Sequence, residues 1–258
     1  MKAINTLRMG GTDVLPLVEG GKGVSVSTGA SAGAWAAAGG AGTISIVNAD
    51  SYDEQGRPVP QVYHGRTRRE RHEELVDYAI RGGIAQARIA HEVSGGKGRI
   101  HANILWEMAA SERVITGVLE GAKGLIHGLT CGAGMPYRLA DIAARFGVHY
   151  YPIVSSARAF NALWKRSYSK ASDLLGGVVY EDPWRAGGHN GLSNTENPFA
   201  PEDPYRACWP CARPCVALGW TIPPLSWPVA SGGWKNGRTG LTVRNWGRLP
   251  SSLAPVRC

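Results

Sequence analysis

Strand-like and helix-like segments alternate along residues 1–205, and this alternation is the feature that most restricts the fold. Strand-like runs are expected at residues 14–19, 43–47, 100–105, 124–129, 148–154 and 174–180. Helix-prone segments lie between them, at residues 30–38, 67–92, 112–119, 137–146 and 157–172. Strands that alternate with helices build βαβ units around a parallel sheet. The pattern therefore predicts an α/β protein with about six such strands.

The helix at residues 67–92 carries two local signals. Thr67 and Glu70 have the spacing of a capping box, which favours a helix start at Thr67. Gly82 and Gly83 fall inside the same segment, and glycine is a poor helix former. We therefore expect a helix that begins at Thr67 and breaks at the glycine pair.

The length of the chain suits one barrel domain. A (β/α)₈ barrel takes about 250 residues, and the chain has 258. Six strands are two short of closure, so the expected fold is an incomplete α/β (β/α)₈ TIM barrel within residues 1–205. Neither an apolar run of membrane-spanning length nor a signal peptide is recognisable, so we expect a cytoplasmic protein without a membrane partner.

Residues 206–258 differ from the rest in charge and composition. The chain has a formal net charge of +8, yet residues 1–205 carry 21 basic and 20 acidic side chains, whereas residues 206–258 carry 7 basic and none acidic. Within residues 1–205, the arginines at 66–71 are interleaved with glutamates, which favours a solvated helix face. The sequence therefore predicts no nucleic-acid partner.

Four of the five cysteines also lie in this tail, at positions 208, 211, 215 and 258. The pair Cys208 and Cys211 has a spacing found in zinc and redox sites. A tetrahedral zinc site needs four ligands, usually in two pairs, and only the terminal Cys258 could complete this one. We expect no metal, and a basic tail without its own domain is the simpler interpretation.

A shift of reading frame explains the tail better than either alternative. If each codon takes the third base of one tail codon and the first two of the next, the pair Trp209-Pro210 encodes Ala, and none of the five tryptophan junctions becomes a stop. With permissive synonymous codons, the tail then reads as two further βα units that contain AGGV and FGTRP. We therefore predict that residues 206–258 are out of frame and that the original gene encoded a closed barrel.

Several in-frame stretches resemble the nitronate monooxygenase family, formerly called 2-nitropropane dioxygenases. The most specific is Ala186-Gly187-Gly188-His189-Asn190-Gly191, which follows the strand-like residues 177–180. Residues 38–44 and 101–103 resemble the family's second-strand entry and third strand. Two departures stand out: Gly20-Gly21-Lys22-Gly23-Val24 replaces the usual Ala-Pro-Met-Ala-Gly, and Arg185 stands where an acid often precedes AGGH.

The resemblance implies an FMN-dependent barrel enzyme that uses O₂ to convert nitronates or nitroalkanes to a carbonyl compound and nitrite. It implies that His189 is the catalytic base and that Gly23, Asn103, Gly187 and Gly188 contact the cofactor. Active sites of such barrels lie at the carboxyl ends of the strands, and neutral histidine suits proton abstraction near neutral pH. From spacing alone, His189 could instead cap a loop, and Asn103 could simply end a strand.

Two other outcomes remain open at the level of sequence. The chain could be a related FMN barrel such as an enoyl-thioester reductase, or a truncated barrel without activity. The FMN phosphate in such barrels is commonly held after strands 7 and 8, so an out-of-frame tail predicts weak flavin retention. Cys131 has no evident partner base and is expected to pack as a small residue rather than act as a nucleophile.

Overall fold

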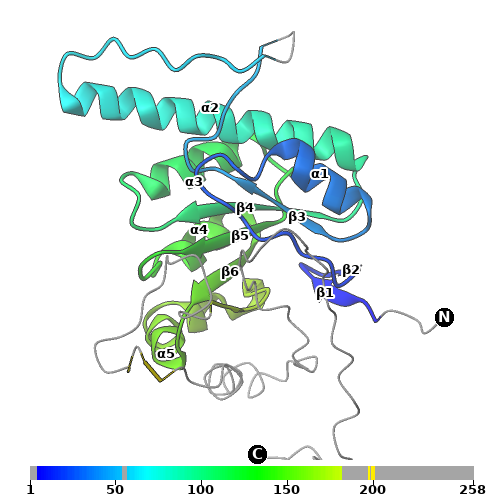
Figure 1. Cartoon of the computed structure of the whole chain (residues 1–258). Coiled ribbons are helices and arrows are strands. Elements are labelled where there is room, and N and C mark those ends of the chain that lie inside the picture. Colours follow the sequence, from blue (N-terminus) through cyan, green and yellow to red (C-terminus); the bar gives the residue numbers. More distant parts are fainter. Residues whose placement is uncertain (1–4, 54–56, 182–196, 198, 201–258) are drawn as a thin grey trace, which may run out of the picture.

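The main sheet of the protein is parallel and open. The computed structural model describes residues 5–53, 57–181, 197, 199 and 200. Its five strands follow the order of the chain: β3 (Ala41–Ser45), β4 (Arg99–Leu105), β5 (Gly128–Gly132), β6 (His149–Val154) and β7 (Val179–Tyr180). The helices between them are α1 (Gly29–Ala37), α2 (Arg68–Ser94), α3 (Ser111–Gly121), α4 (Leu139–Phe146) and α5 (Ala157–Arg166). Figure 1 shows the strands stacked in chain order with α1, α2 and α3 along one side.

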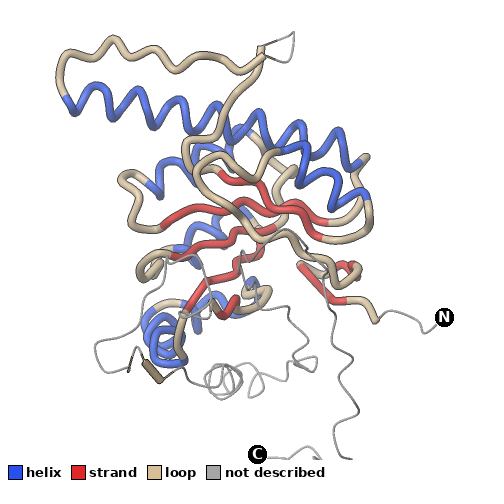
Figure 2. Tube along the Cα trace, in the orientation of Figure 1, coloured by secondary structure: helices blue, strands red, loops and turns tan. Residues whose placement is uncertain are grey.

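This architecture confirms the α/β class and the in-line parallel order expected of an incomplete barrel. Neighbouring strands pair in parallel register throughout, for example Asn103 with Thr130 between β4 and β5. In-line parallel strands place all their carboxyl ends at one edge of the sheet and their amino ends at the other. Figure 2 shows this layering of strands and helices. All the strands therefore begin at one end of the sheet and finish at the other, and we call these the amino end and the carboxyl end.

The prediction of a first strand at residues 14–19 was wrong in detail. Val18 makes only an isolated parallel bridge to Ala41. Val14 instead belongs to an antiparallel hairpin of β1 (Leu7–Met9) and β2 (Thr12–Val14). The chain turns at Pro16, where Leu17 N donates to Leu15 O at 2.7 Å. Proline has no N–H for a strand ladder, which explains why the apolar run does not form one continuous strand.

Helix α2 begins as expected but is not broken by its glycines. Thr67 caps it, and the capping box with Glu70 is present. The helix runs without interruption from Arg68 to Ser94. A Cβ on Gly82 would lie 1.6 Å from Ala49 O, and one on Gly83 would lie 2.5 Å from Val118 Cγ2. The glycine pair therefore allows close packing of α2 rather than ending it.

Three other elements also have bounds that differ from the prediction. The strand expected at residues 124–129 lies at Gly128–Gly132, because the chain turns through Gly124, whose φ is +79°. The helix expected at residues 157–172 ends at Arg166, and a 3₁₀ helix, η1 (Tyr168–Leu174), follows it. The last expected strand is reduced to β7, with Leu175 forming a single bridge to Tyr150.

Successive side chains of a strand point to opposite faces of the sheet. The helices cover one face, and we call the other the inner face. In β4, Ile100, Ala102 and Ile104 join the large apolar core built with the helices. His101 and Asn103 point to the opposite face, as the two-residue period of a strand requires. Near the amino end of that inner face, a second small core joins Met9 and Val14 of the hairpin to Ala41 and Tyr151. None of the helices within the described ranges combines the length and apolarity that a bilayer crossing requires.

Candidate functional site

The carboxyl end of the sheet holds the two expected cofactor residues that the structure describes. Asn103 lies in β4, and Gly23 lies in the loop that precedes α1. His189, Gly187 and Gly188 lie outside the described residues, so their expected roles stay predictions. Strand β7 ends at Tyr180, so the chain toward His189 leaves from this same end.

Asn103 and Thr130 form a polar pair on the inner face of the sheet. They are directly opposite in the parallel register of β4 and β5. The Thr130 hydroxyl donates to Asn103 Oδ1 at 3.2 Å, and Ala102 O lies 3.4 Å from the same hydroxyl. Asn103 is only 5% exposed. A buried amide must be hydrogen-bonded to offset the cost of removing it from water, and Thr130 meets part of that need.

A glycine loop, residues Gly20–Gly23, lies against this pair. A Cβ on Gly21 would fall 2.2 Å from Asn103 Cβ and 2.9 Å from Asn103 Nδ2. Only glycine permits so close an approach. Gly20 has open space where its Cβ would be, and the nearest atom for Gly23 is 4.0 Å away. Gly21 thus packs on Asn103, whereas at Gly20 and Gly23 the loop carries no side chain.

Two serines fix this loop to the neighbouring strand. Ser27 Oγ accepts from Lys22 N at 2.9 Å, and Ser45 N in β3 donates to Ser27 O at 2.8 Å. Ser25 Oγ donates to Asn48 O at 2.9 Å, which joins the loop to the segment that follows β3. Side-chain to backbone bonds of this kind hold an irregular loop in one conformation.

A buried carboxylate anchors the base of the loop. Glu19 is 5% exposed, and its side chain accepts from Ser31 Oγ at 2.6 Å and from Thr43 N at 3.4 Å. Lys22 Nζ lies 3.6 Å from it. Buried charges require such partners. Sequence reasoning missed Glu19, because one acid at the end of an apolar run carries no spacing signal.

Unusual backbone angles also gather at the carboxyl end. Ser25, Asn48 and Ala133 have φ values of +58°, +48° and +54°. Each of the three follows the carboxyl end of a strand or bridged segment. Their φ angles fall in the left-handed region of backbone conformation, which is unfavourable for residues that have a side chain. Strain of this type is found at functional loops more often than elsewhere.

The amino end of the sheet has a different character. The rings of His101 and Tyr151 stack with centroids 4.6 Å apart. His127 Nδ1 accepts from Ile100 N at 3.0 Å, and His149 lies beside Gly10 of the hairpin. Arg99 donates to Gly10 O at 3.2 Å and to Thr12 Oγ1.

Burial keeps these histidines neutral. It lowers the pKa of His101 to about 3, with smaller contributions from His127, Arg99 and His149. Burial also lowers the pKa of His127 to about 4 and, less strongly, that of His149, in both cases with help from the Arg99 charge. The clustering of these three histidines at one end of the sheet was not foreseen from the sequence.

Cys131 behaves as the sequence predicted. It is fully buried on β5, on the helix-covered face, and burial raises the pKa of its thiol. A thiol that stays protonated is a poor nucleophile. Among the described residues, no group of three His, Cys, Asp or Glu side chains is arranged to hold a metal ion.

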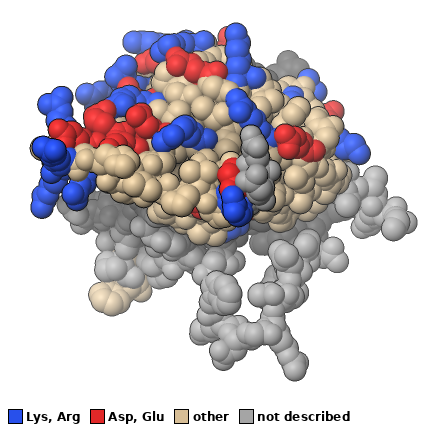
Figure 3. Space-filling view, turned by 90° about the horizontal axis from the view of Figure 1, so that it is seen from above, with Lys and Arg blue, Asp and Glu red and all other residues tan. Residues whose placement is uncertain are grey.

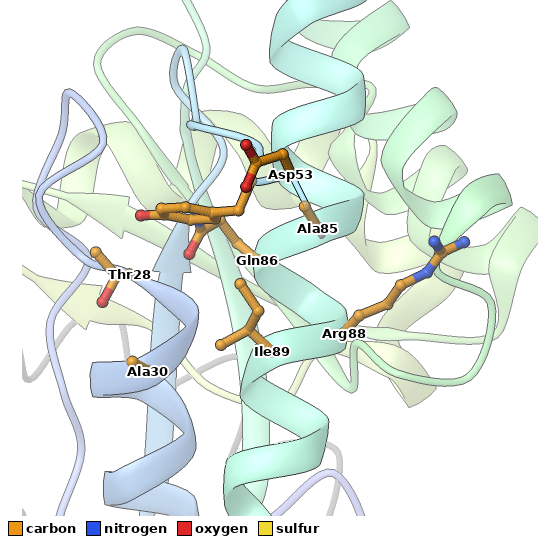
Figure 4. Close-up of a pocket in the computed structure, with 8 residues that line it drawn as sticks. Thr28, Ala30, Asp53, Ala85, Gln86, Arg88 and Ile89 are labelled. Atoms are coloured by element: carbon orange, nitrogen blue, oxygen red, sulfur yellow. The ribbon is translucent and has the colours of Figure 1, made fainter. Parts of the chain in front are cut away.

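An open pocket of about 530 Å³ lies outside the sheet, between α1 and α2 (Figure 4). Gln86 lies at its base, where Oε1 accepts from Gly29 N at 2.5 Å and Nε2 donates to Asp50 O at 2.7 Å. Asp53 on its rim pairs with Arg57 at 2.8 Å, and the Arg88 side chain points away from it. Because the Gln86 amide and the Asp53 carboxylate already have partners in the protein, this pocket is a weaker candidate than the carboxyl end.

The basic cluster on α2 is a solvated face, as expected. Arg66, Arg69 and Arg71 are exposed. Glu73 pairs with Arg113, and Glu74 accepts from His64 N at 3.0 Å. Figure 3, which looks down on this side of the molecule, shows basic and acidic side chains next to each other.

Comparison with known proteins gives only distant similarities. No family model matches the chain, and no curated protein matches it. Among solved structures, FabK from Thermotoga maritima matches with a TM-score of 0.41 and 17% identity, covering 66% of this chain and 41% of that one. A point variant of the same FabK gives 0.45 and 16%, with 69% and 46% covered.

Nitroalkane oxidase from Streptomyces ansochromogenes matches with a TM-score of 0.40 and 12% identity, covering 69% of this chain and 50% of that one. The chain thus spans half or less of the length of these proteins. At such scores and identities the similarities carry no weight for function, which has to be argued from the residues themselves.

Proposed function

We propose that this chain derives from an FMN-dependent nitronate monooxygenase, which oxidises nitronates or nitroalkanes with O₂ to a carbonyl compound and nitrite. The observation that carries the proposal is the contact between Asn103 and the glycine loop at the carboxyl end of the sheet. The AGGH motif of residues 186–189 follows the strand that ends at this same edge. Ligands of parallel α/β folds bind at the carboxyl ends of the strands.

The residues at this end fit a planar ring with hydrogen-bond acceptors along its edge. The outer side of the Gly20–Gly23 loop has no side chain at Gly20 or Gly23, so a flat ring can approach the backbone. Asn103 supplies an amide at the inner side of the same loop. Val24 and Val26, both more than half exposed, offer apolar surface beside it. Bound FMN would supply the electron transfer and oxygen chemistry of the reaction.

The protein's own contribution is binding, orientation and proton transfer. Glu19 and the two serines hold the glycine loop in place. Asn103 would contact the bound flavin, and His189 would remove the proton next to the nitro group. Gly187 and Gly188 would let the backbone approach the cofactor. An enoyl-thioester reductase on the same scaffold would share the ring-binding residues, so substrate tests separate the two activities.

Expression of the chain beside a version with residues 206–258 restored to the other frame tests this proposal. We expect the corrected protein to purify with a flavin absorbance and to release nitrite from a nitronate. We expect the present chain to retain much less flavin and to be less soluble. A His189→Asn variant of the corrected protein should keep its flavin and lose most nitrite release. NAD(P)H consumption with an enoyl thioester and no nitrite would favour the reductase, and equal flavin occupancy in both proteins would contradict the expected effect of the tail.

A further inference from the structure

The β1–β2 hairpin lies at the amino end of the sheet, and Arg99 holds it there. Figure 1 shows the hairpin at the end where the strands begin. Arg99, the first residue of β4, donates to Gly10 O at 3.2 Å and to Thr12 Oγ1. Directly after the hairpin, Leu15 N donates to Gly39 O at 2.8 Å. The chain beyond the hairpin can therefore stay attached to the sheet while the hairpin itself moves.

The His149 ring lies beside the turn of this hairpin. A Cβ on Gly10 would lie only 3.2 Å from His149 Nδ1. Burial lowers the pKa of His149, and the Arg99 charge lowers it further. Among the described residues, no carboxylate pairs with His149 or with Arg99. A proton on His149 would therefore place a second positive charge near Arg99 without an acid to balance it.

The other titratable groups around His149 do not change this balance. On the hairpin, Arg8 and Asp13 pair with each other at 3.4 Å, and both side chains are mostly exposed. On the sheet, three titratable side chains are uncharged at neutral pH: His101, His127 and Tyr151. The described surroundings of His149 thus contain one unpaired cation, Arg99, and no free carboxylate.

We propose that His149 is an acid-sensitive switch for the β1–β2 hairpin: when its ring takes up a proton, the hairpin leaves the amino end of the sheet and uncovers the small core around Tyr151. The sign follows from linkage. With the hairpin in place, the pKa of His149 is lowered from its usual value of about 6.5. With the hairpin away, the ring is in water and its pKa returns toward that value. The released form binds the proton more tightly, so release becomes more favourable as the pH falls below about 6.5.

Release of the hairpin differs from acid unfolding of the whole molecule in what stays folded. The large core between the sheet and the helices contains Ile100, Ala102 and Ile104 of β4 and no residue of the hairpin. The hairpin contributes Met9 and Val14 to the separate small core instead. A two-stranded hairpin alone in water is marginally stable at best. Its backbone amides should therefore exchange with solvent once it leaves the sheet, while those of β4 stay protected.

Hydrogen–deuterium exchange of the full chain at pH 7.5 and pH 5.5, followed by mass spectrometry, tests this. After division by the intrinsic rate at each pH, residues 7–14 should exchange severalfold faster at the lower pH, and residues 99–105 should change much less. His149→Gln should remove most of the pH dependence of the hairpin. His72→Gln, on the solvated face of α2, should leave it intact.

Thr12→Val separates the attachment of the hairpin from its titration. This variant removes an acceptor of Arg99 and no titrating group. The hairpin should exchange about tenfold faster at both pH values, the effect of losing one hydrogen bond to a charged group. Equal loss of protection in the hairpin and in β4 on acidification would overturn the inference, and so would a full pH dependence in His149→Gln. If His149→Gln does not fold, the comparison of hairpin and β4 in the wild-type chain still decides the matter.

Discussion

The two ends of the sheet differ in side-chain packing and in backbone conformation. At the carboxyl end, a glycine loop rests on a buried amide, and three residues with side chains adopt left-handed backbone angles. At the amino end, Arg99 and His149 contact a hairpin, while His101 stacks on Tyr151 and His127 accepts from the backbone of β4. The carboxyl end therefore has strained backbone angles and a loop with few side chains, whereas the amino end is packed tightly. The contrast matches the division seen in barrels, in which the carboxyl face carries function and the amino face carries stability.

Acid should affect the amino end most strongly, and this is the largest effect we expect. The unfolded chain protonates His101 below about pH 6.5, whereas the folded chain does so only near pH 3. The unfolded state therefore binds more protons in that window, and stability falls as the pH falls from 6.5 toward 3. The slope is about 1.4 kcal/mol per pH unit for His101. His127, which is partly solvated, adds a smaller slope down to about pH 4.

Urea unfolding midpoints at several pH values between 7.5 and 4 would measure this loss. A His101→Gln variant should lose stability at neutral pH but show a flatter slope. His72→Gln, at a position on the solvated face of α2, should keep the wild-type slope. If His101→Gln left the slope unchanged, the pH dependence would come from other groups and the contrast between the two ends would weaken.

A matched pair of glycine substitutions compares the ends directly. In Gly128→Ala, the new Cβ would meet His101 and Tyr151 at 2.8 Å. Those rings are stacked and fully buried, so the clash should cost about 1–3 kcal/mol of unfolding free energy. In Gly21→Ala, the Cβ would be even closer to Asn103 Cβ, at 2.2 Å, and the loop can yield only by giving up some of the bonds of Ser25 and Ser27. We expect a smaller loss than in Gly128→Ala, about 1 kcal/mol, because the loop lies at the surface.

Chemical denaturation of both variants separates stability from function when FMN affinity is also measured, in the version with residues 206–258 restored to the other frame. Gly21→Ala should weaken FMN binding because the loop leaves Asn103, while Gly128→Ala should change it little in the folded protein. A larger loss of stability in Gly21→Ala than in Gly128→Ala would show that the loop is as rigid as the hairpin end.

Sequence patterns anticipated the regular parts of the molecule better than the site. The capping box of Thr67 and Glu70 and the order of the parallel strands follow from local chemistry and were confirmed. The continuity of α2 was not foreseen, because the close contact of Gly82 with Ala49 O is made by residues far apart in the sequence. Pro16 offered a local signal against a strand at residues 14–19, and its effect was underestimated.

The site shows the same limit. Asn103 lies in β4, within the strand expected at residues 100–105, and its expected contact with the cofactor stays a prediction. Thr130 and Glu19 were missed, since their roles depend on strand register and on a helix packed across the sheet. Only the register shows that Thr130 lies opposite Asn103. The expected base, His189, lies beyond the described residues, and its position rests on the motif alone.

The smallest effect concerns the strain at the carboxyl end. Ala133 has a φ of +54° and lies in the loop after β5, where its carbonyl accepts from Glu107 N at 3.0 Å. Glycine adopts this angle freely, so Ala133→Gly removes a steric cost but adds freedom to the unfolded chain. We expect a net stabilisation of up to about 1 kcal/mol. Ala144→Gly makes the same change at an exposed position of α4, where the backbone is right-handed, and should destabilise by about 1 kcal/mol. Thermal melts of the two variants should thus move in opposite directions. Equal losses would mean that Ala133 is unstrained and that the carboxyl end differs from the amino end only in packing.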